Sequence, residues 1–365
     1  MAIEGGAVVS GPAREFRVGR RRLGPGRPCF VIAEAGVNHN GRLALARRLV
    51  DAAARAGADA VKFQTFRAER LVTRRARPAP YQRRGVGRGE STFEMLRRLE
   101  LSEKDHRALA AHSRRRNILF LSTPFDPESA GFLARLGVPL FKVSSGDLTD
   151  LPFLESLARR RKPLVLSTGM STLAEVRAAL RAVRRAGAKQ VALLHCVSNY
   201  PAAPADVNLR AMDALVAAFG VPVGFSDHTP GIEVSLAAVA RGACVIEKHF
   251  TLDRRLPGPD HRASLEPAEL AALVRGIRRV ESALGDGRKR PAPSERAMIP
   301  FARKSLVALR DIAVGEKLAP EMVGAKRPGT GLAPAALRRF LGKKVRRPVA
   351  ADRPLTAADF RGGRP

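Results

Sequence analysis

Two histidines stand where two consecutive apolar segments end, in the motifs GFSDHT and VIEKHF. They are His228 and His249, and each segment has the length and composition of a buried strand. Neutral imidazoles at the ends of neighbouring strands suit a divalent metal such as Mn²⁺, Fe²⁺ or Zn²⁺, with positions left open for water and substrate. The alternative is that one histidine caps a strand and the other bonds to the backbone. Asp227 has two possible roles: it either orients His228 or caps the following helix.

Lys62 and Lys142 stand near the ends of two other apolar segments, and Lys248 directly precedes His249. A lysine in such a segment must reach the open end of the sheet, or else be buried at high cost. Hydroxyl and glycine residues follow the same kind of segment, namely Ser144, Ser145, Gly146, Ser167, Thr168, Gly169 and Ser226. Each of these turns is common alone, but together they predict a pocket for phosphate and carboxylate groups, with the first N–H groups after STGMS as further donors.

Parallel strands are the elements that would bring these side chains together. Eight apolar segments begin at Phe30, Ala60, Ile118, Leu140, Leu164, Val191, Val223 and Val245, with a helix-like segment between most neighbours. A closed (β/α)8 barrel gathers the carboxyl ends of all its strands at one mouth. A doubly wound open sheet is the alternative, but its chemistry would cluster at one switch point, whereas every segment here ends in polar residues. The predicted fold class is therefore α/β, a TIM barrel.

Changes in composition divide the chain into four parts. Residues 1–27 hold a tail and a segment of alternating polarity around Gly19, which predicts a β-hairpin that plugs the barrel floor. Residues 28–285 are the predicted barrel. Residues 286–300 are rich in Gly, Pro and charge and predict a linker. Residues 301–365 contain short segments with turn signals and predict a small domain that needs a partner surface to stay folded.

Composition excludes several classes of protein. The formal net charge is +31, but the arginines fall mainly in pairs along helix-like segments, Trp is absent and aromatic residues make up 5%, so nucleic-acid binding is not predicted. Such a positive field would attract an anionic substrate. Apolar runs are far shorter than the ~20 residues of a membrane span, so no membrane association and a cytoplasmic location are expected. Cys29, Cys196 and Cys244 lack metal-like spacing and are expected to be reduced packing residues.

An ordered set of motifs extends from about Glu15 to Phe360. The motifs are FVIAEAGVNHNG, AVKFQTF, STPFD, FKVSSGD, LSTGMS, LLHCVSNYP, GFSDHT, IEKHFTLD and GPDHRASLEP. In this order they resemble the bacterial sialic acid synthase family, and the later KRPGTGL resembles the family's antifreeze-like SAF domain. GPDH together with KRPGTG is more similar to the neuraminate and legionaminate branches than to the pseudaminate branch.

This resemblance implies an enzyme that condenses phosphoenolpyruvate with N-acetylmannosamine or a related N-acetylated amino sugar, giving a nonulosonic (sialic) acid and phosphate. It implies Mn²⁺ or Mg²⁺ bound by His228 and His249, with Glu34 and Lys62 as further catalytic residues. Glu34 then either transfers a proton or only binds sugar hydroxyl groups. A domain-swapped homodimer is also implied, because Arg327 matches an arginine that the SAF domain inserts into the partner's barrel.

The remaining substrate positions are carried over motif by motif. Those that match the phosphoenolpyruvate site are Lys62, Lys142, Ser145, Ser167 and Ser226, and those that match the sugar site are Glu34, Gln64, Tyr200 and Asp260. Ser198 occupies a substrate position where the family often has Asn. No contact residue aligns in the Arg-rich and Gly-rich loop 67–91.

Other functions stay open at this point. They are a pseudaminate-type or seven- or eight-carbon keto-acid synthase, a metal-dependent aldolase that uses free pyruvate, and a noncatalytic carbohydrate-binding barrel. The SAF-like segment disfavours the shorter keto acids, and the three lysines disfavour free pyruvate because it carries no phosphate.

Overall fold

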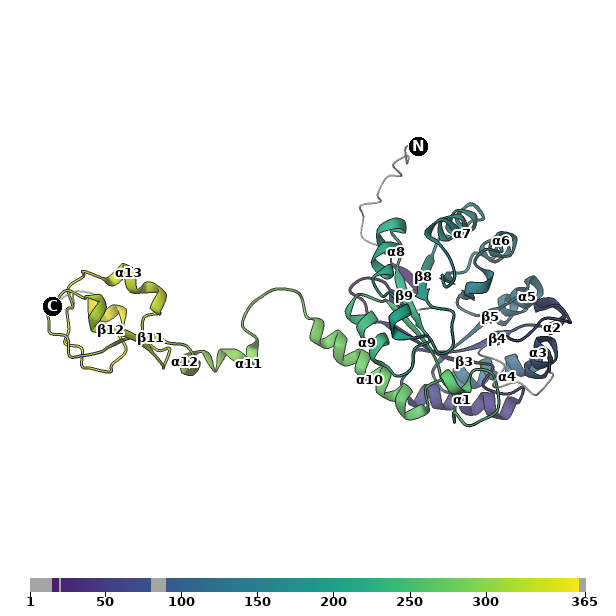
Figure 1. Ribbon diagram of the computed structural model, residues 1–365, viewed down its shortest axis with the longest axis horizontal. Helices are drawn as coiled ribbons and strands as arrows, with labels where there is room; N and C mark the ends of the chain where they lie inside the picture. The colour runs from purple at the N-terminus through teal and green to yellow at the C-terminus, as the bar shows by residue number, and fades with distance from the viewer. Residues whose placement is uncertain (1–14, 20, 80–89, 361–365) are drawn as a thin grey trace. The chain divides into compact units, whose positions relative to one another are not determined.

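The computed structural model describes residues 15–19, 21–79 and 90–360. These residues form two compact units that divide between Gly285 and Asp286 (Figure 1). The predicted N-terminal tail and residues 80–89 of the Arg-rich loop lie outside the described residues.

A parallel eight-stranded sheet closes into a barrel in the first unit. Its strands are β3 (Phe30–Gly36), β4 (Ala60–Thr65), β5 (Leu119–Pro124), β6 (Phe141–Val143), β7 (Leu164–Ser167), β8 (Val191–Cys196), β9 (Val223–Asp227) and β10 (Val245–His249). The last strand pairs with the first, so that His249 lies opposite Glu34. The order continues around the ring as in the chain, and β5 and β6, at the ends of the hydrogen-bonded sheet, contact each other. This arrangement confirms the TIM barrel, since an open doubly wound sheet would not pair its first and last strands.

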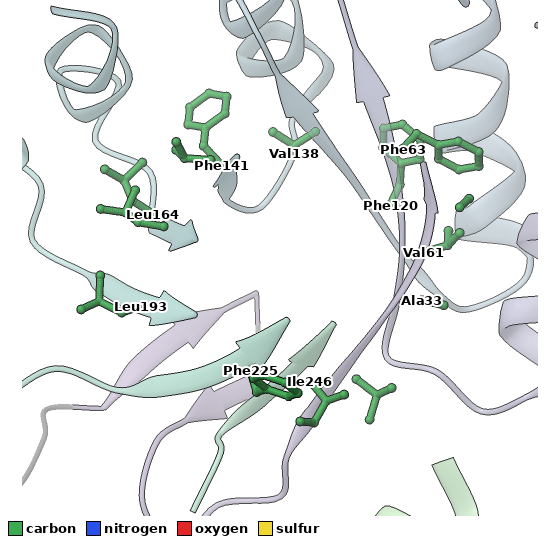
Figure 2. Packing of buried hydrophobic residues seen from close by; sticks show 14 of the residues in the cluster. Ala33, Val61, Phe63, Phe120, Val138, Phe141, Leu164, Leu193, Phe225 and Ile246 are labelled. Atoms are coloured by element: carbon green, nitrogen blue, oxygen red, sulfur yellow. The ribbon is translucent and has the colours of Figure 1, made fainter. Parts of the chain in front are cut away.

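Helices cover the outside of the barrel. They are α1 (Leu43–Arg55), α2 (Ala68–Leu71), α3 (Thr92–Leu99), α4 (Glu103–Arg115), α5 (Pro127–Leu136), α6 (Leu151–Ala158), α7 (Leu173–Arg185), α8 (Ala211–Phe219), α9 (Glu233–Ala240) and α10 (Pro267–Leu284). In α1, Leu49 and Ala53 are buried while Arg47 and Arg48 are exposed, as the 3.6-residue period requires. Figure 2 shows part of the core between strands and helices, with side chains such as Phe63, Phe120 and Phe225.

A hairpin fills the barrel floor, as predicted. It consists of β1 (Phe16–Val18) and β2 (Arg21–Leu23), joined through a turn at Gly19 with φ 60°. Phe16, Val18 and Leu23 pack with residues inside the lower barrel such as Ile32. The apolar floor leaves only the opposite end of the barrel for chemistry.

The second unit is a small domain with its own core. Its antiparallel pair is β11 (Ser305–Ala308) with β12 (Val323–Lys326), and its helices are α11 (Pro293–Arg296), α12 (Ile299–Ala302) and α13 (Leu337–Phe340). Leu306, Ile312, Leu318, Val345 and Leu355 are among its buried side chains.

The predicted linker differs from the structure, because it contains α11 and the start of α12. Pro293 suits the first turn of α11, and the Glu295 carboxylate accepts a hydrogen bond from the Ala292 N–H at 2.7 Å. Within residues 15–19, 21–79 and 90–360, the longest apolar stretch of any helix falls short of what crossing a bilayer would take.

Candidate active site at the barrel mouth

A cavity of about 320 Å³ opens at the carboxyl ends of the strands. Most of the sequence-predicted site residues line it, namely Glu34, Lys62, Gln64, Lys142, Ser145, Ser167, Ser198, Tyr200, Ser226, His228 and His249. Side chains two residues apart on a strand face the same side, which is why Lys62 and Gln64 of β4 both point inward. Closure of the barrel thus brings together residues that are far apart in the chain.

Four charged groups form a buried cluster in this cavity. Lys62 Nζ lies 2.8 Å from Glu34 Oε2 and 3.6 Å from Glu247 Oε1, and Lys142 Nζ lies 3.4 Å from the same Glu247 oxygen. All four side chains are at most 5% exposed. Two ammonium groups therefore meet two carboxyl groups out of contact with bulk water, where their interactions are only weakly screened.

Burial shifts the pKa values in this cluster in different directions. It raises the pKa of Glu34 to about 7, although the Lys62 ammonium group opposes the shift. Burial also opposes ionisation of Glu247, but the ammonium groups of Lys142 and Lys62 outweigh it and lower the pKa of Glu247. Burial lowers the pKa of Lys142. The cavity thus pairs a carboxylate that is held ionised with a carboxyl group that can exchange a proton near neutral pH.

Lys248 does not line this cavity, contrary to the prediction. Its Nζ lies outside the barrel, 2.8 Å from Asp227 Oδ2 and 2.5 Å from the Thr229 carbonyl oxygen. The reason is the two-residue period of β10, which turns Glu247 and His249 inward and Lys248 outward. Glu247, which we did not predict as a site residue, takes the inward position. The same period could have identified it, once His249 was placed in the mouth.

His228 and His249 lie side by side, with ring centroids 5.6 Å apart. His228 Nδ1 lies 2.6 Å from the Val197 carbonyl oxygen, to which it donates, so its Nε2 is left with the lone pair. Burial lowers the pKa of His228 to about 4 and that of His249 well below its usual value, so both rings are neutral at neutral pH. The Tyr200 ring lies against both imidazoles, and its centroid is 4.0 Å from the ring centroid of His228 and 5.5 Å from that of His249.

Asp227 does not contact His228 through a hydrogen bond. Its carboxylate accepts from Thr229 N at 2.8 Å and Oγ1 at 2.7 Å, and from Ser235 Oγ at 2.6 Å. It therefore fixes the loop that leads into α9, and the Val197 carbonyl orients the His228 ring instead.

The two imidazoles suit a divalent cation that has open coordination positions. His249 Nδ1 is buried and has no hydrogen-bond partner among the described residues, where its nearest carboxylate oxygen, Asp260 Oδ2, lies 4.0 Å away. An unpartnered buried nitrogen is costly unless a ligand or ion satisfies it. No group of three or more His, Cys, Asp or Glu side chains within the described residues could hold a metal. The protein would therefore supply two ligands, and water or substrate would supply the rest.

Small residues shape the other side of the cavity. The Gly169 N–H donates to Ser145 Oγ at 3.0 Å, and the Cys196 thiol lies 3.1 Å from the same oxygen. A Cβ atom at position 169 would collide with the Oγ atoms of Ser145 and Ser198. Glycine is thus required where these hydroxyl groups converge, and the buried Cys196 is a free thiol.

Two further predicted residues have different surroundings. Asp260 is buried beside His249 on the loop that precedes the 3-10 turn His261–Ala263. Arg327 directly follows β12 in the second unit. Of the loop 67–91, Ala79 lines the cavity and residues 80–89 lie outside the described part.

Comparison with known proteins gives consistent matches along the chain. A model of the NeuB family matches residues 49–289, and a model of the SAF domain matches residues 303–361. The chain is 50% identical over 316 residues to N,N'-diacetyllegionaminic acid synthase of Campylobacter jejuni, an alignment that covers 86% of this chain and 95% of the relative. It is 46% identical over 341 residues to the enzyme of the same name from Legionella pneumophila, with 92% and 96% covered.

A solved structure agrees with these matches. It is an N-acetylneuraminic acid (sialic acid) synthetase from Leptospira borgpetersenii in complex with citrate, with a TM-score of 0.70 and 38% identity over 79% of this chain and 95% of that chain. The chain therefore belongs to the NeuB family and carries a C-terminal SAF domain, which makes it a phosphoenolpyruvate-dependent condensing enzyme that synthesises nonulosonic acids.

Proposed function

We propose that the protein condenses phosphoenolpyruvate with a diacetamido sugar of the legionaminate type, using a divalent metal such as Mn²⁺ or Mg²⁺. The names of the two relatives above, at 50% and 46% identity, support a product with two acetamido groups over N-acetylneuraminate. N-acetylmannosamine is then a poorer substrate of the same site.

The buried pair Lys62 and Lys142 beside unpartnered hydroxyl and imidazole groups is the observation that carries this proposal. Phosphoenolpyruvate carries a phosphate and a carboxylate, and the two ammonium groups can each receive one of these anions. Ser167 Oγ is buried, has no hydrogen-bond partner within residues 15–19, 21–79 and 90–360, and supplies a further donor in the cavity. Free pyruvate carries a carboxylate but no phosphate, so it would leave one of the two lysines without a substrate anion to bind.

The reaction joins the vinyl carbon of phosphoenolpyruvate to the aldehyde carbon of the sugar. The aldehyde oxygen becomes a hydroxyl group, water adds to the carbon that carries the phosphate, and phosphate leaves. A metal held by His228 and His249 would polarise the aldehyde. In this proposal Glu34, whose pKa is raised, takes the proton released from water, and Lys62 and Lys142 receive the departing phosphate.

Phosphate release from phosphoenolpyruvate tests this proposal. We expect release with Mn²⁺ and a 2,4-diacetamido hexose, slower release with N-acetylmannosamine, and a product mass equal to sugar plus pyruvate. Lys142→Met should abolish release, whereas Lys104→Met, which changes an exposed lysine of α4, should not. Release without sugar, or condensation of free pyruvate at an equal rate, would contradict the proposal.

We further propose a domain-swapped homodimer in which Arg327 reaches the partner's barrel. Arg327→Ala should then raise the KM for the sugar more than the KM for phosphoenolpyruvate. Co-expression of Arg327→Ala with His249→Ala provides a sharper test, because a mixed dimer contains one intact barrel facing one intact SAF domain. At a sugar concentration near the wild-type KM, activity should be high in the mixed dimer, low in Arg327→Ala alone and absent from His249→Ala alone. An equal rise in both KM values, or no recovery, would count against the swap.

A further inference from the structure

A second cavity, of about 460 Å³, lies on the outside of the barrel and shares no lining residue with the catalytic cavity. It is bounded by the end of β4 and by α2, α4 and α5. Its lining includes four arginines, Arg67, Arg70, Arg135 and Arg160. Its size falls within the range of small-molecule sites, roughly 300–1,000 Å³.

The carboxylates near this cavity are already engaged. Arg67 pairs with Glu100 at 2.7 Å. Arg70 lies 3.4 Å from Asp126 and 3.7 Å from Glu128. The remaining acidic residue of the lining, Glu103, receives a hydrogen bond from Arg107 at 2.8 Å.

Arg135 and Arg160 are left without a carboxylate within ion-pair distance among the described residues. Their guanidinium groups nevertheless converge, because a Cβ atom placed on Gly131 would lie 3.5 Å from Arg135 Nη1 and 3.5 Å from Arg160 Nη2. Arg160 Nη2 donates to the Pro127 carbonyl oxygen at 3.2 Å, and Arg160 Nε is buried without a hydrogen-bond partner in the described part of the chain. Two like charges held together beside an unsatisfied donor call for an anion.

We propose that this cavity binds a small phosphate-bearing molecule, with the phosphate held between Arg135 and Arg160. The planar guanidinium fork matches phosphate oxygens in pairs, and glycine at position 131 leaves the space between the two forks open. The cavity is larger than a phosphate ion needs, so a sugar or similar group attached to the phosphate fits beside Arg70 and the apolar edge formed by Phe132.

Calorimetric titration of the full-length protein tests the site with two probes, inorganic phosphate and glucose 6-phosphate. The variant is Arg135→Gln/Arg160→Gln, and the matched control is Arg181→Gln/Arg184→Gln, which removes the same charge from exposed positions of α7. We expect at least one probe to bind about ten-fold or more weakly to the variant and within about two-fold of wild type to the control. Tighter binding of glucose 6-phosphate would assign the site to a phosphorylated metabolite, and equal binding to free phosphate.

The catalytic lysines also attract phosphate, so the titrations are repeated with saturating phosphoenolpyruvate and no sugar. The difference between variant and control should persist. Equal binding by variant and control, loss of the difference with phosphoenolpyruvate, or no saturable binding in wild type would overturn the proposal. Arg135→Gln alone, which changes an exposed side chain, keeps the test valid should the double variant unfold.

Discussion

Glu247 is the group on which the buried charge cluster depends, and Glu247→Gln tests this directly. Its Oε1 lies 3.6 Å from Lys62 Nζ and 3.4 Å from Lys142 Nζ, and its side chain is 5% exposed. The substitution keeps the shape of the side chain but leaves Glu34 as the one carboxylate that pairs with the two buried ammonium groups among the described residues. Breaking a buried ion pair in this way costs about 3–5 kcal/mol. We therefore expect a loss of that size in the free energy of unfolding of the barrel at neutral pH.

The loss should shrink as the pH rises. Burial already lowers the pKa of Lys142, and removal of the neighbouring carboxylate lowers it further. A lysine whose pKa is lower in the folded than in the unfolded state binds fewer protons when folded, so stability increases with pH between the two values. Phosphoenolpyruvate should also stabilise Glu247→Gln more than wild type, because its anionic groups replace the missing charge.

Urea unfolding at pH 7 and pH 9.5, with and without phosphoenolpyruvate, measures these effects. Glu69→Gln is the matched control, since Glu69 is an exposed carboxylate of α2, and it should stay within about 0.5 kcal/mol of wild type. The reasoning is refuted if Glu247→Gln matches this control at pH 7, or if its deficit grows at pH 9.5.

Three further substitutions probe separate features. His249→Ala should lose nearly all phosphate release. Its circular dichroism and unfolding midpoint should stay close to wild type, because the substitution removes no hydrogen bond of His249 Nδ1 among the described residues. Retained turnover would count against a metal-binding role for His249. Lys248→Met should cost about 3–5 kcal/mol in urea unfolding, because the buried Asp227 loses its cation, without changing the KM for phosphoenolpyruvate in the folded fraction. Burial and the negative charge of Asp150 raise the pKa of Asp147 to about 7. The free energy of unfolding of the wild type should therefore fall, relative to Asp147→Asn, by up to about 3 kcal/mol as the pH rises from 4 to 8. A difference that stays constant over this range would contradict the shifted pKa.

The sequence predicted the fold well because its local signals agree with the global arrangement. The helix α1 follows from a 3.6-residue spacing of apolar side chains, and α5 ends at Gly137, which adopts the αL conformation. Both features depend on residues that are close together in the sequence, so the sequence alone can predict them. Closure of the barrel depends on the pairing of Phe30 with Val245, which no local pattern encodes. It could be inferred only because every strand ends in polar residues, and a single switch point would not need that.

The residue types predicted which segments form the site, but they predicted less well which side chains point into the cavity. Lys248 was taken for a phosphate ligand because lysine in an apolar segment normally reaches a mouth. Its actual partner, Asp227, stands 21 residues earlier on the adjacent strand, and a buried pair of this kind is visible only once the register is known. The carbonyl group of Val197 orients His228, and residue types alone cannot predict this contact because every residue carries the same backbone group.

The two carboxyl groups of the cavity differ because their surroundings differ, although both are buried. Glu247 stands between two ammonium groups, whose attraction outweighs burial and keeps it ionised. Glu34 forms an ion pair with Lys62, is attracted more weakly by Lys142 and also senses the negative charge of Glu247, so burial prevails and its pKa rises to about 7. Pairs of titratable groups whose pKa values are pushed apart divide acid–base work between them. We therefore propose that Glu247 anchors Lys62 and Lys142 and that Glu34 transfers the proton. An anion that engages the two lysines weakens their attraction for the carboxylates, so we expect the pKa of Glu34 to rise further when phosphoenolpyruvate binds and to fall again when phosphate leaves.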